Sequence, residues 1–428
     1  MKNVLLYTLL VVIVATSCKS DDTNEIIQET ESPNPNILLI ISDDMGLDAT
    51  PNYPIGSTKP NMPNLESFMA NGITFSNVWA NPLCSPTRAS ILTGKFGFRT
   101  GVSRVPSQLS SAEHILQNDM PNYKTALIGK WHLSNNVSQP ITMGIDYFAG
   151  ILGGGVSSYQ NWSLVEDGNS STSTVYTTTK LTDLAIDWVN NQNETWFLWL
   201  AYNAPHTPFH LPPANLHSQG NLASDQASID ANPLPYYLAS LEAMDTEIGR
   251  LLQSMTEAER ENTLIIFIGD NGSPTQVSQD YPNRRAKGTI YQGGINVPMA
   301  VSGKNVTRIN ERDNSLINAT DLYNTIVEIS GNTTTQNNDS KSFKNLLENT
   351  GTSTRDFAFS EISFDNNNSD YTIRSLTHKY ILFSDASEAL FNLADDALEN
   401  TNLLDQTLST TDTEIYNKLK SELNSILN

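Results

Sequence analysis

The chain has 428 residues and a formal net charge of −21. This length suffices for one large core with a smaller partner, because single cores stop growing at about 250–300 residues. The acidic balance excludes nucleic acid as a partner, since the grooves that bind nucleic acid are basic. An anionic substrate would meet a repulsive overall field, so a pocket for one must concentrate the few cations locally.

The first residues have the character of an export signal. Lys2 precedes an apolar run from Val4 to Val14, which is long enough for a signal-peptide core and too short to span a membrane. The following Ala15-Thr16-Ser17-Cys18 resembles the lipobox of bacterial lipoproteins, whose cysteine carries lipid. The acidic stretch after Cys18 resembles the export tag of Bacteroidetes surface lipoproteins, and an ordinary solvated linker fits it equally well. We therefore expect a signal peptide over residues 1–17 and an outer-membrane lipoprotein that faces the cell surface or the periplasm.

Residues 18–35 are polar and lack a hydrophobic period, which predicts a flexible tether. From Asn36 onwards, short apolar runs alternate with amphipathic segments. The runs predict strands, and the segments predict helices. The expected strands are Ile37–Ile41, Ala126–Ile128, Trp196–Tyr202, Leu264–Ile268 and Met299–Val301, and the expected helices are Met62–Ala70, Thr182–Asn190, Leu234–Met255 and Asp321–Ile329. This alternation predicts an α/β catalytic domain over residues 36–330 with a mainly parallel sheet.

A smaller C-terminal subdomain is expected over residues 331–428. Its first residues, Gly331–Ser340, are rich in Gly, Asn and Thr, as in a linker. Three short strands and a final helix are expected after it. The strands are Phe357–Ser360, Tyr371–Leu376 and Tyr380–Phe383, in a small antiparallel sheet, and the helix is Glu414–Leu427.

Polar groups directly follow four of the predicted strands. They are Asp43 and Asp44, Lys130 and His132, His206, and Asp270 and Asn271. In open parallel sheets, ligands bind beyond the carboxyl ends of the strands, so these groups should meet. The oxygens of the three Asp residues and the Asn suit Ca²⁺, with Mg²⁺ as the alternative, and do not suit zinc. Either pair alone would more often form a turn or cap a helix.

Cys84 requires its own explanation. The chain has two cysteines, and a lipid on Cys18 leaves Cys84 without a disulfide partner. Cys84 is then either an inert buried thiol or a chemically special group. The residues after it predict a helix with Pro86 in the first turn. Cys84 would lie at the helix N-terminus, which favours an anion, and Arg88 would point back to the same spot.

The segment from Cys84 to Gly94 reads CSPTRASILTG and resembles the sulfatase signature Cys-x-Pro-x-Arg followed by Ala-Ser-Ile-Leu-Thr-Gly over its full length. Residues Tyr123–His132 resemble a second sulfatase element, with Asn122 in place of the usual glycine. The resemblance extends through Asp43-Asp44, Ala204–His206, Asp245–Gly249, Asp270–Gly272, Lys287-Gly288, Tyr291–Gly294 and Leu390–Leu393. It thus covers nearly all of the chain after Asn36. It implies an alkaline phosphatase-like α/β/α sandwich.

The resemblance also implies a cofactor set. A formylglycine-generating or sulfatase-maturing enzyme would convert Cys84 to formylglycine, whose hydrated aldehyde attacks sulfur. Ca²⁺ would be ligated by Asp43, Asp44, Asp270, Asn271 and the group derived from Cys84.

Roles for the remaining residues follow from the same resemblance. Arg88 would stabilise the formylglycine oxygens, and Lys130 and Lys287 would neutralise sulfate charge. His132 would take a proton from the sulfated hydrate, and His206 would assist the leaving group.

The expected activity is hydrolysis of sulfate esters on a sulfated carbohydrate. A phosphodiesterase or phosphonate monoester hydrolase of the same superfamily is the enzymatic alternative. A catalytically inactive lipoprotein that binds sulfated glycans is the other, but no catalytic residue of the motifs is missing. Arg104, His210, Arg284 and Arg285 could contact a sugar, although exposed solubilising charge is the more frequent role of such residues.

Overall fold

The computed structural model describes residues 34–334, 338–349 and 355–428. The expected signal peptide, the expected lipid-bearing Cys18 and nearly all of the expected tether lie outside these residues. The chain from Asn34 to Asn428 forms one compact unit. Within the described ranges, no helix combines the length and the apolar character needed to cross a membrane.

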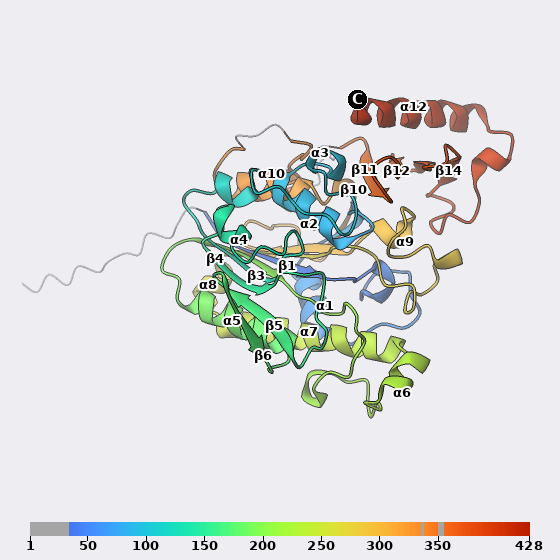
Figure 1. Ribbon diagram of the computed structural model, residues 1–428. Helices are drawn as coiled ribbons and strands as arrows, with labels where there is room; N and C mark the ends of the chain where they lie inside the picture. Colours follow the sequence, from blue (N-terminus) through green and yellow to red (C-terminus); the bar gives the residue numbers. More distant parts are fainter. Residues whose placement is uncertain (1–33, 335–337, 350–354) are drawn as a thin grey trace, which may run out of the picture. The chain divides into compact units, whose positions relative to one another are not determined.

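A mixed ten-stranded sheet runs through this unit in the order β10-β2-β9-β8-β1-β7-β3-β4-β5-β6 (Figure 1). Its strands are β1 Asn36–Ser42, β2 Gly72–Trp79, β3 Lys124–Lys130, β4 Tyr147–Ile151, β5 Trp162–Glu166, β6 Asn169–Ser173, β7 Trp196–Ala201, β8 Thr263–Gly269, β9 Met299–Gly303 and β10 Glu311–Asn318. The central strands β8, β1, β7, β3 and β4 pair in parallel. Their carboxyl ends therefore lie along one edge of the sheet.

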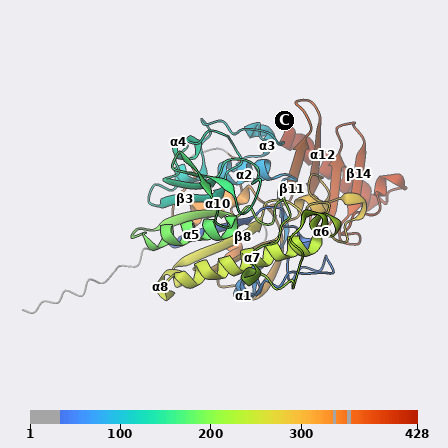
Figure 2. The same cartoon turned by 60° about the horizontal axis from the view of Figure 1, so that its bottom comes forward.

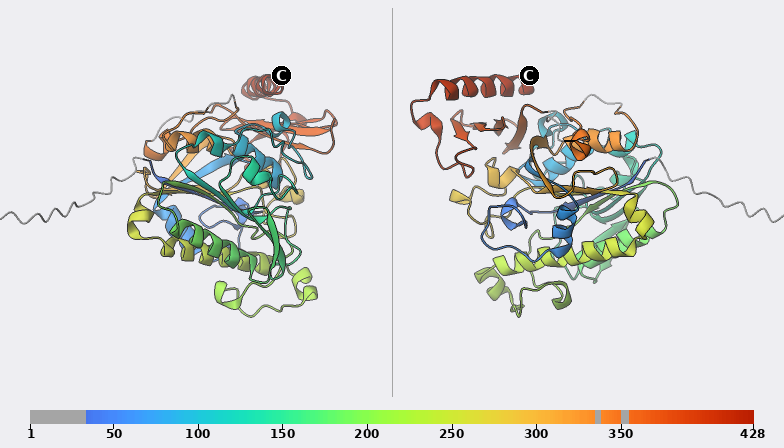
Figure 3. Two further views of the ribbon diagram at one scale, coloured as in Figure 1. Left: turned by 60° about the vertical axis from the view of Figure 1, so that its left-hand side comes forward. Right: turned by 180° about the vertical axis from the view of Figure 1, so that it is seen from behind.

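Helices cover both faces of this sheet. Side chains alternate across a strand, so Ile37, Leu39 and Ile41 of β1 join the core under α2 (Cys84–Thr93) and α10 (Asp321–Ile329). Leu38 and Ile40 join the opposite core with α1 (Pro63–Ala70), α5 (Thr177–Asn190) and α7 (Leu234–Ser254). Helices α5 and α7 lie side by side (Figures 1 and 2). In the view from behind, α7 runs along the lower face (Figure 3).

A second, four-stranded antiparallel sheet lies near the C-terminus. Its strands are β11 Ala358–Ser363, β12 Ser369–Arg374, β13 His378–Leu382 and β14 Glu388–Asn392, in that order. The last helix, α12 (Thr410–Leu427), packs on β12 and β13 and buries Leu419 and Leu423 against Tyr380 (Figure 1). The shorter helices are α3 Gly97–Thr100, α4 Gln139–Thr142, α6 Gln226–Ala231, α8 Glu257–Glu261, α9 Gln292–Ile295 and α11 Asn345–Glu348.

The predicted fold class is confirmed: a mainly parallel sheet lies between two helical layers, and a small antiparallel sheet follows. All of the predicted strands and helices overlap observed ones. Six observed strands were not predicted, namely β2, β4, β5, β6, β10 and β14, and two of these are largely polar. Strand β6 has the sequence NSSTS, and the first half of β10 is largely exposed, so neither carries an apolar alternation. The large core also takes in Phe343, and the second sheet begins at Ala358.

One contact between the second sheet and α3 contains a buried acid. Glu361 of β11 accepts a hydrogen bond from the backbone N–H of Phe98 at 2.8 Å through Oε1. Among the described residues, no group hydrogen-bonds to its buried Oε2. Burial raises the pKa of Glu361 from 4.5 to about 7. The folded chain therefore keeps this carboxyl protonated over a pH range in which the unfolded chain ionises it.

We predict that Glu361→Gln is more stable than the wild type at pH 8 and nearly equal to it at pH 5. Between pH 4.5 and 7 the wild type loses stability as the pH rises, because only the unfolded state releases the proton. The uncharged amide avoids this loss of stability, which is worth about 3 kcal/mol. Urea unfolding at both pH values measures the difference. A difference that does not depend on pH would contradict the assignment.

Candidate active site

The parallel strands bring the predicted polar groups to one edge of the sheet. Strands β1 and β8 are in register up to Ser42 and Gly269, so Asp43 and Asp270 emerge side by side. Strand β3 ends at Lys130 beside β7, and the chain beyond β7 leads to His206. The expectation that these groups meet is therefore confirmed by the register of the sheet.

The carboxylates form one buried cluster. Asp43 and Asp270 are fully buried, and the backbone N–H of Asp44 donates to Oδ1 of Asp270 at 3.1 Å. The side-chain amide of Asn271 donates to Oδ1 of Asp44 at 2.8 Å. The hydroxyl of Tyr237, on α7, donates to the carbonyl of Asp44 at 2.8 Å. These bonds hold the backbone of Asp44 in the left-handed region, at a φ of 72°.

Three cations surround the carboxylates. Arg88 donates through Nη2 and Nε to Oδ2 of Asp270, at 2.8 and 3.1 Å, and through Nη1 to the carbonyl of Lys130 at 2.7 Å. Lys130 itself donates to Oδ2 of Asp43 at 2.5 Å. The ammonium of Lys287 contacts Oδ1 of Asp44. The structure thus brings all three predicted cations to one cluster.

The two buried carboxyl groups, Asp43 and Asp270, differ in how strongly their surroundings stabilise the ionised form. Burial would raise the pKa of Asp43, but the charges of Lys130 and His206 outweigh it and hold the pKa well below its usual value. Burial and repulsion from Asp43 raise the pKa of Asp270. The neighbouring cations thus stabilise the charge of Asp43 better than that of Asp270, which leaves the cluster suited to a further positive charge.

Cys84 occupies the first residue of α2, as the sequence predicts. Its thiol is buried, with Sγ 3.2 Å from Nδ1 of His132 and 3.5 Å from Nζ of Lys130. Burial raises the pKa of the thiol despite the nearby ammonium of Lys130. An unmodified Cys84 is therefore a poor thiolate nucleophile at neutral pH.

The two histidines approach the cluster from different segments. Burial and the charge of Lys130 lower the pKa of His132 to about 3, so its ring is neutral and can accept a proton. Nδ1 of His206 lies 2.7 Å from the carbonyl of Thr207, which can only accept, so Nδ1 carries the proton. Nε2 of His206 then faces Oδ2 of Asp44 at 3.8 Å.

Supporting residues outside the motifs were missed by the sequence reasoning. The hydroxyl of Tyr159 contacts the carbonyls of Asn203 and His206 at 2.8 and 2.7 Å, which ties down the segment that carries His206. His210 stacks on Tyr159 with ring centroids 3.8 Å apart. Arg285 lies 4.1 Å over the ring of Tyr291. Both side chains are only partly exposed, so the interpretation of His210 and Arg285 as exposed solubilising charge is wrong.

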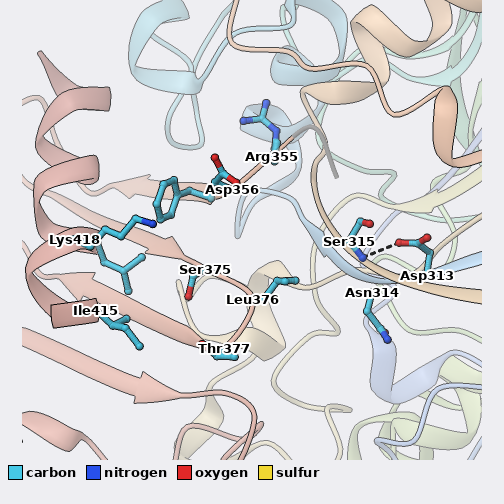
Figure 4. Close-up of a pocket in the computed structure, with 12 residues that line it drawn as sticks. Asp313, Asn314, Ser315, Arg355, Asp356, Ser375, Leu376, Thr377, Ile415 and Lys418 are labelled. Atoms are coloured by element: carbon cyan, nitrogen blue, oxygen red, sulfur yellow. Dashed lines mark hydrogen bonds between the residues drawn. The ribbon is translucent and has the colours of Figure 1, made fainter. Parts of the chain in front are cut away.

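The chemistry does not coincide with the large cavities. One cavity of about 660 Å³ lies between β10, the turn after β12 and α12, where Figure 4 shows Ser315, Leu376 and Lys418 among its lining residues. Another, of about 1150 Å³, is lined by residues such as Tyr53 and Arg374. Neither is lined by a predicted site residue. A pocket of about 190 Å³ contains Asp44 and Lys287 and opens the charged cluster to solvent.

The donor set fits a hard divalent cation. Ligand atoms of Asp43, Cys84 and Asp270 lie within 4.8 Å of one another. Among the described residues, none hydrogen-bonds to Oδ1 of Asp43 or to Oδ1 of Asn271, although both atoms are buried. Buried oxygens without a donor are costly unless a cation satisfies them. Carboxylate and amide oxygens are ligands for Ca²⁺ or Mg²⁺.

Comparison with known families agrees with this site. The family model described as Sulfatase matches residues 35–332, which is more than half of the chain. The chain belongs to the sulfatase family. A second model, described as N-sulphoglucosamine sulphohydrolase, C-terminal, matches residues 285–428. The match of the first model spans all of the predicted site residues of this sulfatase-family chain.

Relatives of this sulfatase-family chain include the uncharacterized sulfatase YdeN of Escherichia coli (strain K12). It is 29% identical over 357 residues, which cover 69% of this chain and 62% of YdeN. The chain spans less than two thirds of the length of the first curated relatives that it matches.

Solved structures that resemble the fold of this sulfatase-family chain include two with bound sugars. The crystal structure of Ps i-CgsB in complex with k-i-k-neocarrahexaose covers 92% of each chain, at 24% identity and a TM-score of 0.78. A structure in complex with its substrate D-glucosamine-2-N,6-O-disulfate covers 92% of this chain and 98% of that chain, at 20% identity and a TM-score of 0.76. At these identities the likeness concerns the fold alone.

We predict that Ca²⁺ stabilises the folded chain through this cluster. At a free concentration of about 100 times Kd, a ligand of the folded state adds about 2.7 kcal/mol to the free energy of unfolding. Asp43→Asn should remove most of that increment, because it takes away a buried anionic ligand. Thermal unfolding with and without Ca²⁺, after treatment with chelator, measures it. The exposed Asp230→Asn is the control, and equal increments in both variants would refute the site.

Proposed function

We propose that the chain hydrolyses sulfate esters of a sulfated carbohydrate and releases inorganic sulfate. The observation that supports this most directly is the position of Arg88, Lys130 and Lys287. These three cations converge on Cys84 and the acidic cluster in a chain whose net charge is −21. Together with a divalent cation among the carboxylates, these cations would give the local positive charge that an anionic ester requires.

The proposed nucleophile belongs to residue 84. After conversion of Cys84 to formylglycine by a maturing enzyme, the hydrated aldehyde supplies a hydroxyl that can attack sulfur. Residue 84 lies at the N-terminus of α2. We propose that the backbone amides of the first turn and the guanidinium of Arg88 would stabilise negative charge that develops there. Membership of the sulfatase family supports this modification.

A bound Ca²⁺ would be held by Asp43, Asp44, Asp270 and Asn271, with Mg²⁺ as the alternative. It would supply Lewis-acid polarisation of a sulfate oxygen and lower the pKa of a coordinated hydroxyl. Lys130 and Lys287 would neutralise the other sulfate oxygens.

Proton transfer is assigned to the two histidines. His132 would accept a proton at Nδ1 from the remaining hydroxyl of the sulfated hydrate at residue 84, because Nδ1 lies 3.2 Å from Sγ and the ring is neutral. The carbon–oxygen bond to sulfate then breaks, inorganic sulfate leaves and the aldehyde re-forms. His206 holds a proton at Nε2 for the departing alcohol oxygen, while Nδ1 stays bonded to the carbonyl of Thr207. Burial lowers the pKa of His206, which makes its protonated form a stronger acid toward an alkoxide.

A carbohydrate substrate is supported by the structural relatives. One of them binds k-i-k-neocarrahexaose, and the substrate of another is D-glucosamine-2-N,6-O-disulfate. These ligands belong to those proteins. For this chain, we propose a sulfated carbohydrate as the class of substrate.

The proposal includes the cellular setting that the first residues predict. We propose that the chain is exported and anchored by lipid on Cys18, in the outer membrane, facing either the cell surface or the periplasm. The lipobox-like Ala15-Thr16-Ser17-Cys18 supports this. Labelling with a radioactive fatty acid tests it, and a Cys18→Ala variant that still takes up label would contradict it.

We predict that sulfate release requires both residue 84 and the divalent cation. The full chain is produced with a sulfatase-maturing enzyme and assayed with an aryl sulfate and a panel of sulfated sugars. Cys84→Ala should fall below about one thousandth of the wild-type rate, because it removes the nucleophile. Chelation should abolish release, and Ca²⁺ should restore it. Mass spectrometry of the peptide that contains residue 84 establishes the modification in the wild type.

Two outcomes would contradict the proposal. If residue 84 is formylglycine and a phosphodiester or phosphonate ester is cleaved while no sulfate ester is, the chain is a phosphohydrolase of the same superfamily. If no ester is cleaved and a sulfated glycan binds with the same affinity to wild type and Cys84→Ala, the chain is a binding protein.

A further inference from the structure

A run of three glycines follows β4 and lies against both histidines of the site. The backbone N–H groups of Trp131 and His132 donate to the carbonyls of Ile151 and Leu152, at 2.8 and 3.0 Å. These two bonds extend the pairing of β3 with β4 past the end of the sheet. They bring Gly154, in the glycine run Gly153–Gly155, against the imidazole of His132.

The three glycines differ sharply in the space around them. A Cβ added to Gly154 would lie 2.6 Å from Nε2 and 2.7 Å from Cε1 of His132. A Cβ added to Gly155 would lie 3.2 Å from the ring of His206. A Cβ added to Gly153 would meet nothing within 4 Å. None of the three has a φ in the left-handed region, so an alanine at each position meets no backbone strain.

A methyl group at residue 154 would displace the imidazole of His132 from its position beside Cys84. The carbonyl of His132 accepts a hydrogen bond from the hydroxyl of Ser85 at 2.8 Å, and its N–H is bonded to Leu152. The backbone of His132 is thus fixed on both sides, at a φ of 56°. The ring can move only by rotation of the side chain. Moving Nε2 from 2.6 Å to an ordinary contact of 3.4 Å therefore carries Nδ1 away from Cys84.

We propose that Gly154 is a positioning residue for the proposed reaction, because its missing side chain lets the main chain lie against His132 and hold the ring beside Cys84. This inference rests on the proposed sulfate ester hydrolysis, in which His132 accepts a proton. The close approach has a chemical use. A ring confined between Gly154 and Cys84 keeps Nδ1 within reach of the hydroxyl at residue 84, and catalytic rates depend steeply on such placement.

The test compares Gly154→Ala with Gly153→Ala in the full chain after maturation. A displacement of the order of 1 Å costs roughly 100-fold in rate. We expect kcat for sulfate release to fall about 10- to 100-fold in Gly154→Ala, with KM within about twofold of the wild type, because the ring is not proposed to bind substrate. Gly153→Ala should keep the wild-type kcat. Equal kcat values in the two variants, or a change confined to KM, would overturn the proposal.

A second measurement does not depend on maturation or on sulfate release. In the protein with unmodified Cys84, Gly154→Ala should lower the Tm by roughly 2 °C or more relative to Gly153→Ala, because the methyl group overpacks the ring. In a His132→Ala background, Gly154→Ala and Gly153→Ala should have the same Tm, because the imidazole ring is absent. A difference that persists without His132 would overturn the proposal. If the wild type releases no sulfate, the proposed function fails, and this double-mutant cycle still decides whether Gly154 places His132.

Discussion

The structure depends on keeping opposite charges together inside a low-dielectric region. Asp43, Asp270, Arg88 and Lys130 are each at most 1% exposed. A buried charge that lacks a partner costs several kcal/mol, so each of these side chains must be delivered to its partner within hydrogen-bonding distance. That requirement fixes the register of β1, β3 and β8. If one of these strands shifted by one residue, a charged side chain would point into an apolar layer on one face of the sheet.

The C-terminal region holds in place the segment that follows Lys287, one of the cations of this cluster. Lys379, on β13, donates to Oε1 of Glu399 at 2.5 Å and to the carbonyl of Ile290 at 2.6 Å. The other carboxylate oxygen of Glu399 accepts from the N–H of Gln292 at 2.6 Å. The segment that follows Lys287 is thereby tied to the second sheet by a buried ion pair. The small sheet thus contributes to the placement of a site cation although none of its residues belongs to the charged cluster.

The sequence predicts those parts of the fold and site that carry a local pattern. Strands such as β1 are uninterrupted apolar runs, and Asp43 or Lys130 could be located because each directly follows such a run. Family motifs located Cys84 and Arg88. Strand β6 could not be predicted, because it is polar and exposed and owes its conformation to pairing with β5. Tyr159 and Gly154 were also missed, since their roles depend on contacts with residues far away in the sequence.

The charge count of the site explains why a metal ion matters to binding as well as to chemistry. Asp43, Asp44 and Asp270 carry three negative charges, and Arg88, Lys130 and Lys287 balance them. Because the paired cations are already committed to these carboxylates, the cluster alone offers a sulfate ester little net attraction. The rest of the chain repels an anion. A divalent cation among the carboxylates would leave the cluster with a net positive charge, and would release the ammonium of Lys287 to face the substrate.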